Sequence, residues 1–457
     1  MANRLREAAA PVFLFCCLVL GGSSQGIFAN MVLRLLGIGL LAWAALAPAT
    51  ASASRRDRQL FSLALIALVL VGVQLVPLAP GVWESLGPRR LIADGYRVLG
   101  VASPWLPLSV SAYDSLAAIL ALVPALGLLA AILRLGCRPL WLALALVVGT
   151  VGGILLGALQ VSSPDPANSP WYLYEQTNAG LATGFFANAN HMASLLVITL
   201  PFLAAALASA RAERDNIQRY SALVALVAGL TLVIAVGIAL NGSLAGFGLV
   251  VPVLVASAAI VLPGRRGAIR WLAPAAGVLL VAAVAWLATT PVGSSGSLRS
   301  SAETSVQSRE EIVATTMKAT REFMPLGSGI GTFRRVYALY EDHDRLDPTT
   351  YVNHAHNDYL ELALETGVPG LVLLVLFLAW WARAAWRAWS PGHPDPYARA
   401  AAVASAAILV HSLVDFPLRT AAISACFAMC LALLARKLPR PADDKSHLWS
   451  TRHVVVG

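Results

Sequence analysis

The sequence contains very little charge. Asp, Glu, Lys and Arg make up 12% of its 457 residues, whereas 58% of the residues are hydrophobic and the mean hydropathy is +0.71. A soluble domain carries about 25% charged residues, so this composition excludes an ordinary soluble protein. Cysteine is scarce as well. None of the five cysteines lies in an expected outer loop, and the sequence therefore predicts no disulfide.

Long apolar runs recur from one end of the chain to the other. Most are close to the ~20 residues with which a helix crosses the ~30 Å hydrocarbon core of a bilayer. The twelve candidate runs are 11–29, 31–49, 59–78, 114–134, 139–160, 190–209, 220–239, 244–262, 271–290, 368–386, 400–416 and 420–435. We therefore predict an all-α polytopic membrane protein with about 12 transmembrane helices.

The positive charge gathers on one side of the expected membrane. The chain has 33 basic and 24 acidic residues, a net charge of +9, and most basic residues fall in short segments that join alternate spans. These segments are 4–6, 55–58, 134–138, 211–219, 265–270, 383–399 and the tail from residue 436. This is the positive-inside pattern of cytoplasmic loops. It predicts an inner-membrane protein with both termini in the cytoplasm and argues against a nucleic-acid partner. The first apolar run could be a signal peptide, but no convincing cleavage site follows it, so we expect a retained helix.

The outer loop between the ninth and tenth spans, residues 291–367, is the longest in the chain. Loops of this length are usually functional or disordered. This loop has the pattern of a partly helical segment, with helices expected over about 302–323 and 332–340. The expected organisation is spans one to nine (1–290), a periplasmic catalytic loop (291–367), spans ten to twelve (368–436) and a cytoplasmic tail (437–457).

The end of this loop carries the densest polar chemistry in the sequence. It begins Asn353-His-Ala-His-Asn-Asp-Tyr, and nine residues separate the His356-Asn357 pair from Gly367-x-x-Gly370. Within a large outer loop, this pattern resembles the motif of the bacterial O-antigen ligase family, which includes O-antigen and exopolysaccharide polymerases. Further segments similar to that family are 186–191, 325–333 and 411–419, so the resemblance covers most of the chain.

The resemblance implies a metal-independent, inverting glycosyltransferase of the membrane-embedded type, without a cofactor. Its donor is expected to be a glycan on undecaprenyl pyrophosphate, presented at the periplasmic face. Its acceptor is expected to be another glycan or a lipid A core. An acceptor hydroxyl would attack the anomeric carbon, and the lipid pyrophosphate would leave. The sequence does not decide between a ligase, a polymerase and a protein glycosyltransferase.

A hydroxyl nucleophile needs a base that titrates near neutral pH, and histidine is the natural choice. His356 matches the catalytic position of the family and is the first candidate. His354 is the second, and Asn357 completes the predicted catalytic set. Two alternatives stay open. His356 could cap the following helix, or His354, His356 and Asp358 could bind zinc, although their spacing is not a standard metal signature.

A pyrophosphate leaving group calls for cations, and the arginine fork suits phosphate oxygens. Arg309 matches a family arginine, whereas Arg334 and Arg335 follow the glycine-rich segment 327–331. Backbone amides at the start of the helix over 332–340 could also face an anion. The alternatives are solvated arginines and a plain tight turn. Many relatives carry two further arginines, at the positions that Ala189 and Leu244 occupy here.

Polar residues also gather at the expected outer ends of other spans. Asn188, Asn190 and His191 precede the sixth span, where they could bind sugar or phosphate, or simply cap a helix. His411 and Asp415 are four residues apart and share a helix face at the end of the eleventh span. Arg419 follows them, and a simple ion pair between Asp415 and Arg419 is the alternative. These residues are candidates for a substrate groove.

Two other functional classes fit a chain of this kind. Twelve helices with both termini inside is a common plan for transporters, so a flippase for the same lipid-linked glycan is one alternative. A non-catalytic subunit of polysaccharide assembly is another. The expected spans hold almost no ionisable residues, and the chemistry lies in outer loops, so an enzyme at the membrane surface is the favoured interpretation.

Overall fold

The computed structural model describes most of the chain. The described residues are 2–24, 27–49, 54–211, 217–262, 296–342, 352–390 and 395–436. Side chains are described from residue 4 in the first of these ranges and from residue 309 in the range 296–342. The expected ninth span, 271–290, and the expected tail, 437–457, lie outside the described residues.

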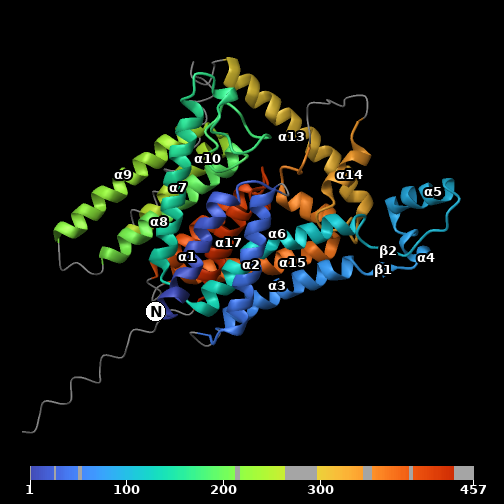
Figure 1. The fold of residues 1–457 in the computed structure, drawn as a ribbon, viewed down its shortest axis with the longest axis horizontal. Coiled ribbons are helices and arrows are strands. Elements are labelled where there is room, and N and C mark those ends of the chain that lie inside the picture. The colour runs from blue at the N-terminus through green and yellow to red at the C-terminus, as the bar shows by residue number, and fades with distance from the viewer. Residues whose placement is uncertain are drawn as a thin grey trace, which may run out of the picture.

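The described part of the chain is almost entirely helical (Figure 1). The longer helices of the first half are α1 (Ala2–Leu20), α2 (Phe28–Leu46), α3 (Arg55–Gln74), α6 (Ala112–Ala130), α7 (Pro139–Val161), α8 (Ala189–Arg211), α9 (Ile217–Asn241) and α10 (Leu244–Val261). Those of the second half are α13 (Gly296–Phe323), α14 (Phe333–Tyr340), α15 (Asp358–Trp389), α16 (Pro396–His411) and α17 (Ala421–Ala435).

Shorter elements sit in the connections. The one between α3 and α6 contains β1 (Pro77–Leu78), α4 (Pro80–Trp83), the 3-10 turn η1 (Gly87–Arg89), α5 (Arg90–Val98) and β2 (Leu106–Pro107). β1 and β2 pair in antiparallel fashion, and with α4 and α5 they project from one edge of the helical bundle (Figure 1). A π-helical turn, η2 (Ala131–Leu135), extends α6, and two more 3-10 turns are η3 (Pro166–Asn168) and η5 (Pro417–Arg419).

Eight helices in the described ranges are long and apolar enough to cross a membrane: α2, α3, α6 with η2, α7, α8, α9, α10 and α15. The sequence predicted twelve spans, and that number is not confirmed. Helix α1 carries Arg4, Arg6 and Glu7 near its start. Helices α16 and α17 have 16 and 15 residues, which is short for a ~30 Å crossing.

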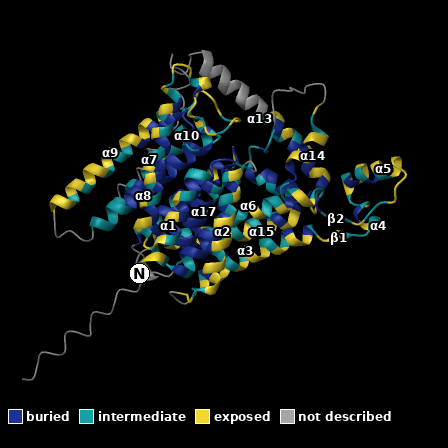
Figure 2. Cartoon of the chain, viewed as in Figure 1, coloured by how far each residue is buried: buried dark blue, intermediate teal, exposed yellow. Residues whose placement is uncertain are grey.

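The helices form an inner and an outer layer. In its apolar window, α8 is 78% buried, whereas α9 is only 17% buried. Helix α8 packs against α10 and α16, and α17 packs against α6 and α16. Figure 2 shows the same contrast, with α17 dark blue in the middle and α9 mostly yellow at the edge. The exposed side chains of α9 include Leu226, Leu232 and Val236, which suit contact with lipid.

Small residues allow the inner helices to approach closely. Most buried positions of α16 are alanines, and helix association in membranes depends on such small side chains because lipid tails offer no hydrophobic drive. At the α2–α6 contact, a Cβ on Gly127 would lie 2.9 Å from the carbonyl oxygen of Gly37. A larger residue there would push the two helices apart.

Helix α15 joins the bundle to the preceding helices α13 and α14 and bends at Gly367. This glycine has φ 60° and ψ −151°, and a Cβ at this position would lie 2.1 Å from the carbonyl oxygen of Pro325. Only glycine fits such a backbone in such a close approach. The part of α15 before Gly367 packs with α13 and α14, and the part after it continues as the apolar helix.

Helices α13, α14 and the start of α15 have a small core of their own. It contains Ile312, Ala319, Phe333, Val336 and Leu364, all of them buried. We call residues 309–342 and 352–366 the loop lobe. The two helices expected in this loop are thus present, although α13 begins at Gly296 rather than near residue 302.

Candidate functional site

His356 lies in the short connection that leads into α15, and its backbone is unusual. It is the one non-glycine residue with a positive φ, 50°, in the described ranges. Such a conformation costs energy for a residue with a Cβ and is often found at functional sites. Asn357, not His356, caps the helix. Its Oδ1 accepts hydrogen bonds from the backbone N–H groups of Tyr359 and Leu360, at 3.0 and 2.9 Å.

The carboxylate of Asp415 is the point on which several predicted site residues converge. Its Oδ1 lies 3.3 Å from His356 Nδ1, and its Oδ2 lies 4.0 Å from both Arg309 Nη2 and His411 Nε2. Asn190 Nδ2 also donates a hydrogen bond to Oδ2. The four partners come from the loop lobe, α8 and α16, so the fold brings together residues that are up to 225 positions apart.

Asp415 is almost inaccessible to solvent, with 1% of its side chain exposed. Burial by itself raises the pKa of a carboxyl group. Here the contact with His356 is the largest of the influences that outweigh burial, and the pKa of Asp415 lies far below its ordinary value. The group therefore remains a carboxylate.

Phe416 places three of the histidines around one aromatic ring. Its ring centroid lies 4.4 Å from that of His354, 4.9 Å from that of His191 and 5.0 Å from that of His356. The sequence analysis did not single out Phe416, because a lone phenylalanine next to an apolar helix gives no signal of its own. Its position explains why His354, His356 and His191 face a common space.

The two histidines of the loop differ in what their ring nitrogens contact. His354 Nδ1 lies 2.9 Å from Glu361 Oε1, and its Nε2 lies 3.3 Å from Ser24 Oγ. His356 Nδ1 lies 3.3 Å from the Asp415 carboxylate without forming a hydrogen bond, and Nε2 has no partner in the described part of the chain. The His356 side chain is 23% exposed. His356 is therefore the better placed of the two to meet a substrate.

Arg419 does not form the ion pair with Asp415 that the sequence left open as an alternative. Its guanidinium instead contacts three carboxylates of α15: Asp358 at 3.5 Å, Glu361 at 3.3 Å and Glu365 at 3.2 Å. Burial alone would lower the pKa of Arg419, but these carboxylates raise it above its ordinary value. The arrangement ties the turn after α16 to the first turns of α15, and it makes Arg419 a structural residue of the site.

The sequence analysis missed Glu361 and Glu365. The signal was present, since Asp358, Glu361 and Glu365 are spaced three and four residues apart and therefore share one face of a helix. An acidic stripe of this kind, next to an apolar span and buried in the fold, requires a cation. Arg419 is that cation, but it lies far from the three acidic residues in the sequence, so the pattern alone does not identify it.

The glycine-rich segment 327–331 is a tight turn whose amides already have partners. The N–H groups of Gly331 and Phe333 donate to Glu365 Oε1, at 2.9 and 3.4 Å. The Ile330 N–H donates to Gln74 Oε1 at 3.0 Å, and the Gly329 N–H donates to the Glu365 carbonyl at 2.9 Å. Glu365 thus supplies the anion at the start of α14. These four amides are therefore not available to a pyrophosphate. The structure favours a plain tight turn over the prediction that amides at the start of this helix face an anion.

Arg334 and Arg335 are both exposed on α14. The side chain of Arg335 pairs with Asp114, near the start of α6. It therefore fastens the loop lobe to the bundle rather than joining the group around Asp415. Of the three arginines expected to bind the donor, Arg309 is the one that the fold brings to His356.

The polar residues before α8 divide into two roles. Asn188 Oδ1 accepts a hydrogen bond from the N–H of Asn190 at 2.8 Å, which is the expected capping contact. The side chain of Asn190 points to Asp415 and also accepts from Ser243 Oγ at 2.7 Å. His411 Nδ1 lies 2.6 Å from Ser194 Oγ. These contacts hold Asp415 and His411 in place from the sides of α8 and α10.

A small cavity lies beside His354. Arg34 and Arg419 line it, together with Ser23, Ser24 and Asn30. Arg34 has neither a hydrogen bond nor an ion pair in the described part of the chain. As for metals, no three His, Cys, Asp or Glu side chains in the ranges that the structure describes lie close enough to hold an ion.

A family model described as O-antigen ligase matches residues 229–375. This range contains Arg309, His354, His356 and the bend at Gly367, but it ends before Asp415. It is narrower than the resemblance found in the sequence, which extended over most of the chain. No curated protein matches the chain. The match supports an assignment to that family.

Proposed function

This chain is assigned to the O-antigen ligase family, and from that premise we propose that it transfers a glycan from undecaprenyl pyrophosphate to a sugar hydroxyl. The reaction takes place at the periplasmic face of the bacterial inner membrane. The observation that carries the proposal is the convergence of His356 and Arg309 on the buried carboxylate of Asp415. A base and a cation are the two groups that such a transfer needs.

His356 is the base in this proposal. Asp415 holds Nδ1 and stabilises the imidazolium, which leaves Nε2 to take the proton of the acceptor hydroxyl. The acceptor oxygen then forms a bond to the anomeric carbon. The bond between that carbon and the diphosphate oxygen breaks, and the leaving diphosphate keeps the electron pair. Attack from the side opposite the leaving group inverts the anomeric configuration.

Arg309 is the first candidate to bind the diphosphate. Its contact with Asp415 is 4.0 Å long and engages one Nη, so the remaining donors of the guanidinium can face an anion near His356. Arg34 is the second candidate, because its charge is not matched by a described carboxylate and it faces the cavity beside His354. Arg334 ranks below both, and Arg335 is engaged by Asp114.

Other members of the predicted set act through position. Asn190 and His411 contact Asp415, so we assign them to holding its carboxylate. Asn357 caps α15 and also donates to the carbonyl of Leu413 at 2.9 Å, which fixes the backbone next to His356. His354 is a positioning residue for Glu361. Of the residues predicted from the sequence, His356 and Arg309 are the ones proposed to touch the reacting groups.

The test is transfer from purified undecaprenyl-pyrophosphate glycan by the full chain in detergent. We expect His356→Ala to lower the turnover by roughly 10²–10⁴, the usual contribution of a general base, while donor binding persists. His447→Ala, in the segment 437–457, is the matched control and should transfer as the parent does. Parent activity should also persist in a chelator, because the proposed mechanism uses no metal.

Each arm of this experiment can overturn part of the proposal. Transfer by His356→Ala at the parent rate would remove the base assignment and point to His354. Loss of parent activity in the chelator would restore a metal to the mechanism. The acceptor follows from the product: a glycan attached to lipid A core identifies a ligase, and a lengthened glycan identifies a polymerase.

A further inference from the structure

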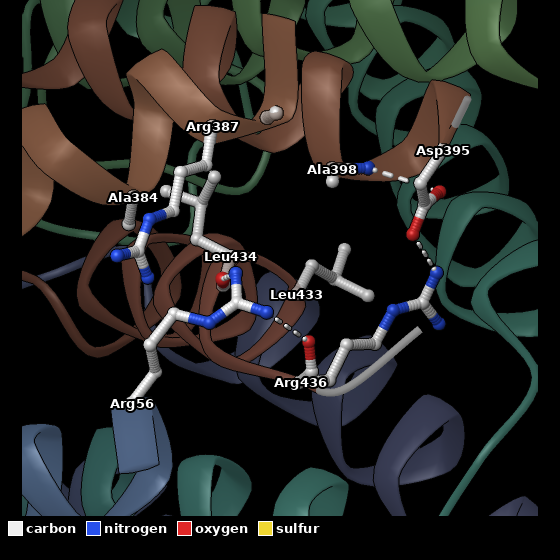
Figure 3. Close-up of a pocket in the computed structure, with 9 residues that line it drawn as sticks. Arg56, Ala384, Arg387, Asp395, Ala398, Leu433, Leu434 and Arg436 are labelled. Atoms are coloured by element: carbon white, nitrogen blue, oxygen red, sulfur yellow. Dashed lines mark hydrogen bonds and ion pairs between the residues drawn. The ribbon is translucent and has the colours of Figure 1, made fainter. Parts of the chain in front are cut away.

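A second cationic site lies at the opposite end of the bundle from His356. Its walls come from the first turn of α3, the last turns of α15 and α17, and the start of α16 (Figure 3). At the other end of α3, Gln74 hydrogen-bonds the carbonyl of Glu365, beside the candidate active site. The 20 residues of α3 correspond to about 30 Å, the thickness of the hydrocarbon core. The two sites therefore lie at opposite membrane surfaces.

Three guanidinium groups and one carboxylate line this pocket. Both carboxylate oxygens of Asp395 have partners within the protein. Its Oδ1 accepts hydrogen bonds from the N–H groups that begin α16, and its Oδ2 pairs with Arg436. Arg56 donates to the carbonyl oxygens of Leu434 and Arg436, at 3.0 and 3.3 Å. Those carbonyls carry no full charge. The pocket thus has an excess of positive charge.

The side chain of Arg387 has no partner in the part of the chain that the structure describes. It projects into the same side of the pocket as the side chain of Arg56 (Figure 3). Two like charges in one cavity repel each other unless an anion lies between them. The charge and geometry of the pocket therefore suit an anion.

Aromatic side chains place the pocket at the level of lipid headgroups. Trp386 and Trp389 flank Arg387 on α15 and are 79% and 38% exposed. Exposed tryptophans of spanning helices favour the interface between headgroups and hydrocarbon. Leu433 and Ala384 give the same pocket an apolar wall. A ligand here would meet cations at one end and apolar side chains at the other.

We propose that this pocket binds the phosphate of an anionic phospholipid in the leaflet opposite the candidate active site. Arginine forks match phosphate oxygens, and basic pockets between spanning helices are suited to such headgroups. Free phosphate carries the same charge, but it has no apolar part to contact the apolar wall and no reason to be concentrated at the level of the headgroups. A bound headgroup would join α3, α15 and α17 by contacts to Arg56 and Arg387. The proposal does not depend on the function proposed above.

The test compares lipids on the full chain purified in detergent. Phosphatidylglycerol, phosphatidylcholine and inorganic phosphate are added separately, and bound lipid is measured by native mass spectrometry alongside the melting temperature. We expect phosphatidylglycerol to bind and to raise the melting temperature, and the other two additives to have little effect. Arg387→Gln should weaken phosphatidylglycerol binding about tenfold, as expected for the loss of one charge-assisted contact.

The matched control is Arg383→Gln. Arg383 is exposed one turn earlier on α15, and its guanidinium donates to the Ala379 carbonyl outside the pocket. It should bind phosphatidylglycerol as the parent does. Equal binding of both lipids, or equal losses in the two variants, would overturn the site. If inorganic phosphate alone raised the melting temperature as much as phosphatidylglycerol does, the ligand of the pocket would be free phosphate and not a lipid.

Discussion

His356 Nδ1 lies 3.3 Å from Asp415 Oδ1, although His356 precedes α15 and Asp415 follows α16. The imidazole is partly exposed and the carboxylate is buried, so the pair has one face toward solvent and one anchored in the fold. A carboxylate next to the imidazole is placed to stabilise the imidazolium that forms when a histidine accepts a proton. The role of His356 can therefore be tested at Asp415 as well as at His356 itself.

Asp415→Asn should lower kcat/KM across the whole range from pH 5 to 9. The amide keeps the size of the carboxylate but removes the negative charge that faces His356 Nδ1 and Arg309, so the imidazolium formed during transfer loses its stabilisation. Because the pKa of Asp415 is far below its ordinary value, the parent has this carboxylate ionised throughout that range. A pH–rate profile of the parent and the variant measures the loss, and an unchanged kcat/KM would separate Asp415 from the base.

His356→Gly should separate backbone strain from chemistry. A residue with a Cβ at φ 50° costs about 1 kcal/mol that glycine does not. The glycine variant should thus be more stable than His356→Ala, while both lose transfer. Thermal unfolding in detergent, together with the transfer assay, gives both quantities. Equal melting temperatures would mean that the local backbone relaxes at no cost.

Arg419→Gln should destabilise the protein rather than change a substrate constant. It would leave the carboxylates of Glu361 and Glu365 buried without their cation, at a cost of about 3–5 kcal/mol. Arg90→Gln, on an exposed position of α5, is the control and should be close to neutral. The measurements are the yield of folded protein and its melting temperature. A folded, stable variant with a raised KM for the donor would instead make Arg419 part of the substrate groove.

The sidedness of the site can be tested with accessibility tags. We expect tags at residues 300 and 345 to report the periplasm, and tags at 214, 266 and the C-terminus to report the cytoplasm. The physical reason is the basic character of the segments around 214 and 266, which cytoplasmic loops share. A cytoplasmic signal from residue 345 would place His356 on the wrong side for a lipid-linked donor.

Local patterns in the sequence predicted the local parts of the structure. The helices of the loop lobe follow from helical periodicity, which acts within a few residues. The number of spans was less predictable. Helices α16 and α17 are packed among other helices, so protein rather than lipid covers them and they need not have the full length of a lipid-facing span.

Pairing between distant residues could not be predicted. Asp415 and Arg419 are neighbours in sequence, and their opposite charges suggested an ion pair. In the structure, Arg419 instead pairs with Glu361 and Glu365. Asp415 contacts His356 and Arg309. The choice depends on how α15 and the turn after α16 pack, which no local pattern records. The motif identified His356, but only the fold identified the carboxylate behind it.

Glu365 determines how an anion can be held at this surface. Because its carboxyl group accepts hydrogen bonds from the N–H groups at the start of α14, those donors are not open to a second anion. An incoming diphosphate would have to rely on arginine side chains such as Arg309, which is partly exposed. Attraction of that kind weakens as dissolved ions screen it. Capture of the donor should therefore become less efficient as ionic strength rises, even where the lipid tail partitions into the bilayer unchanged.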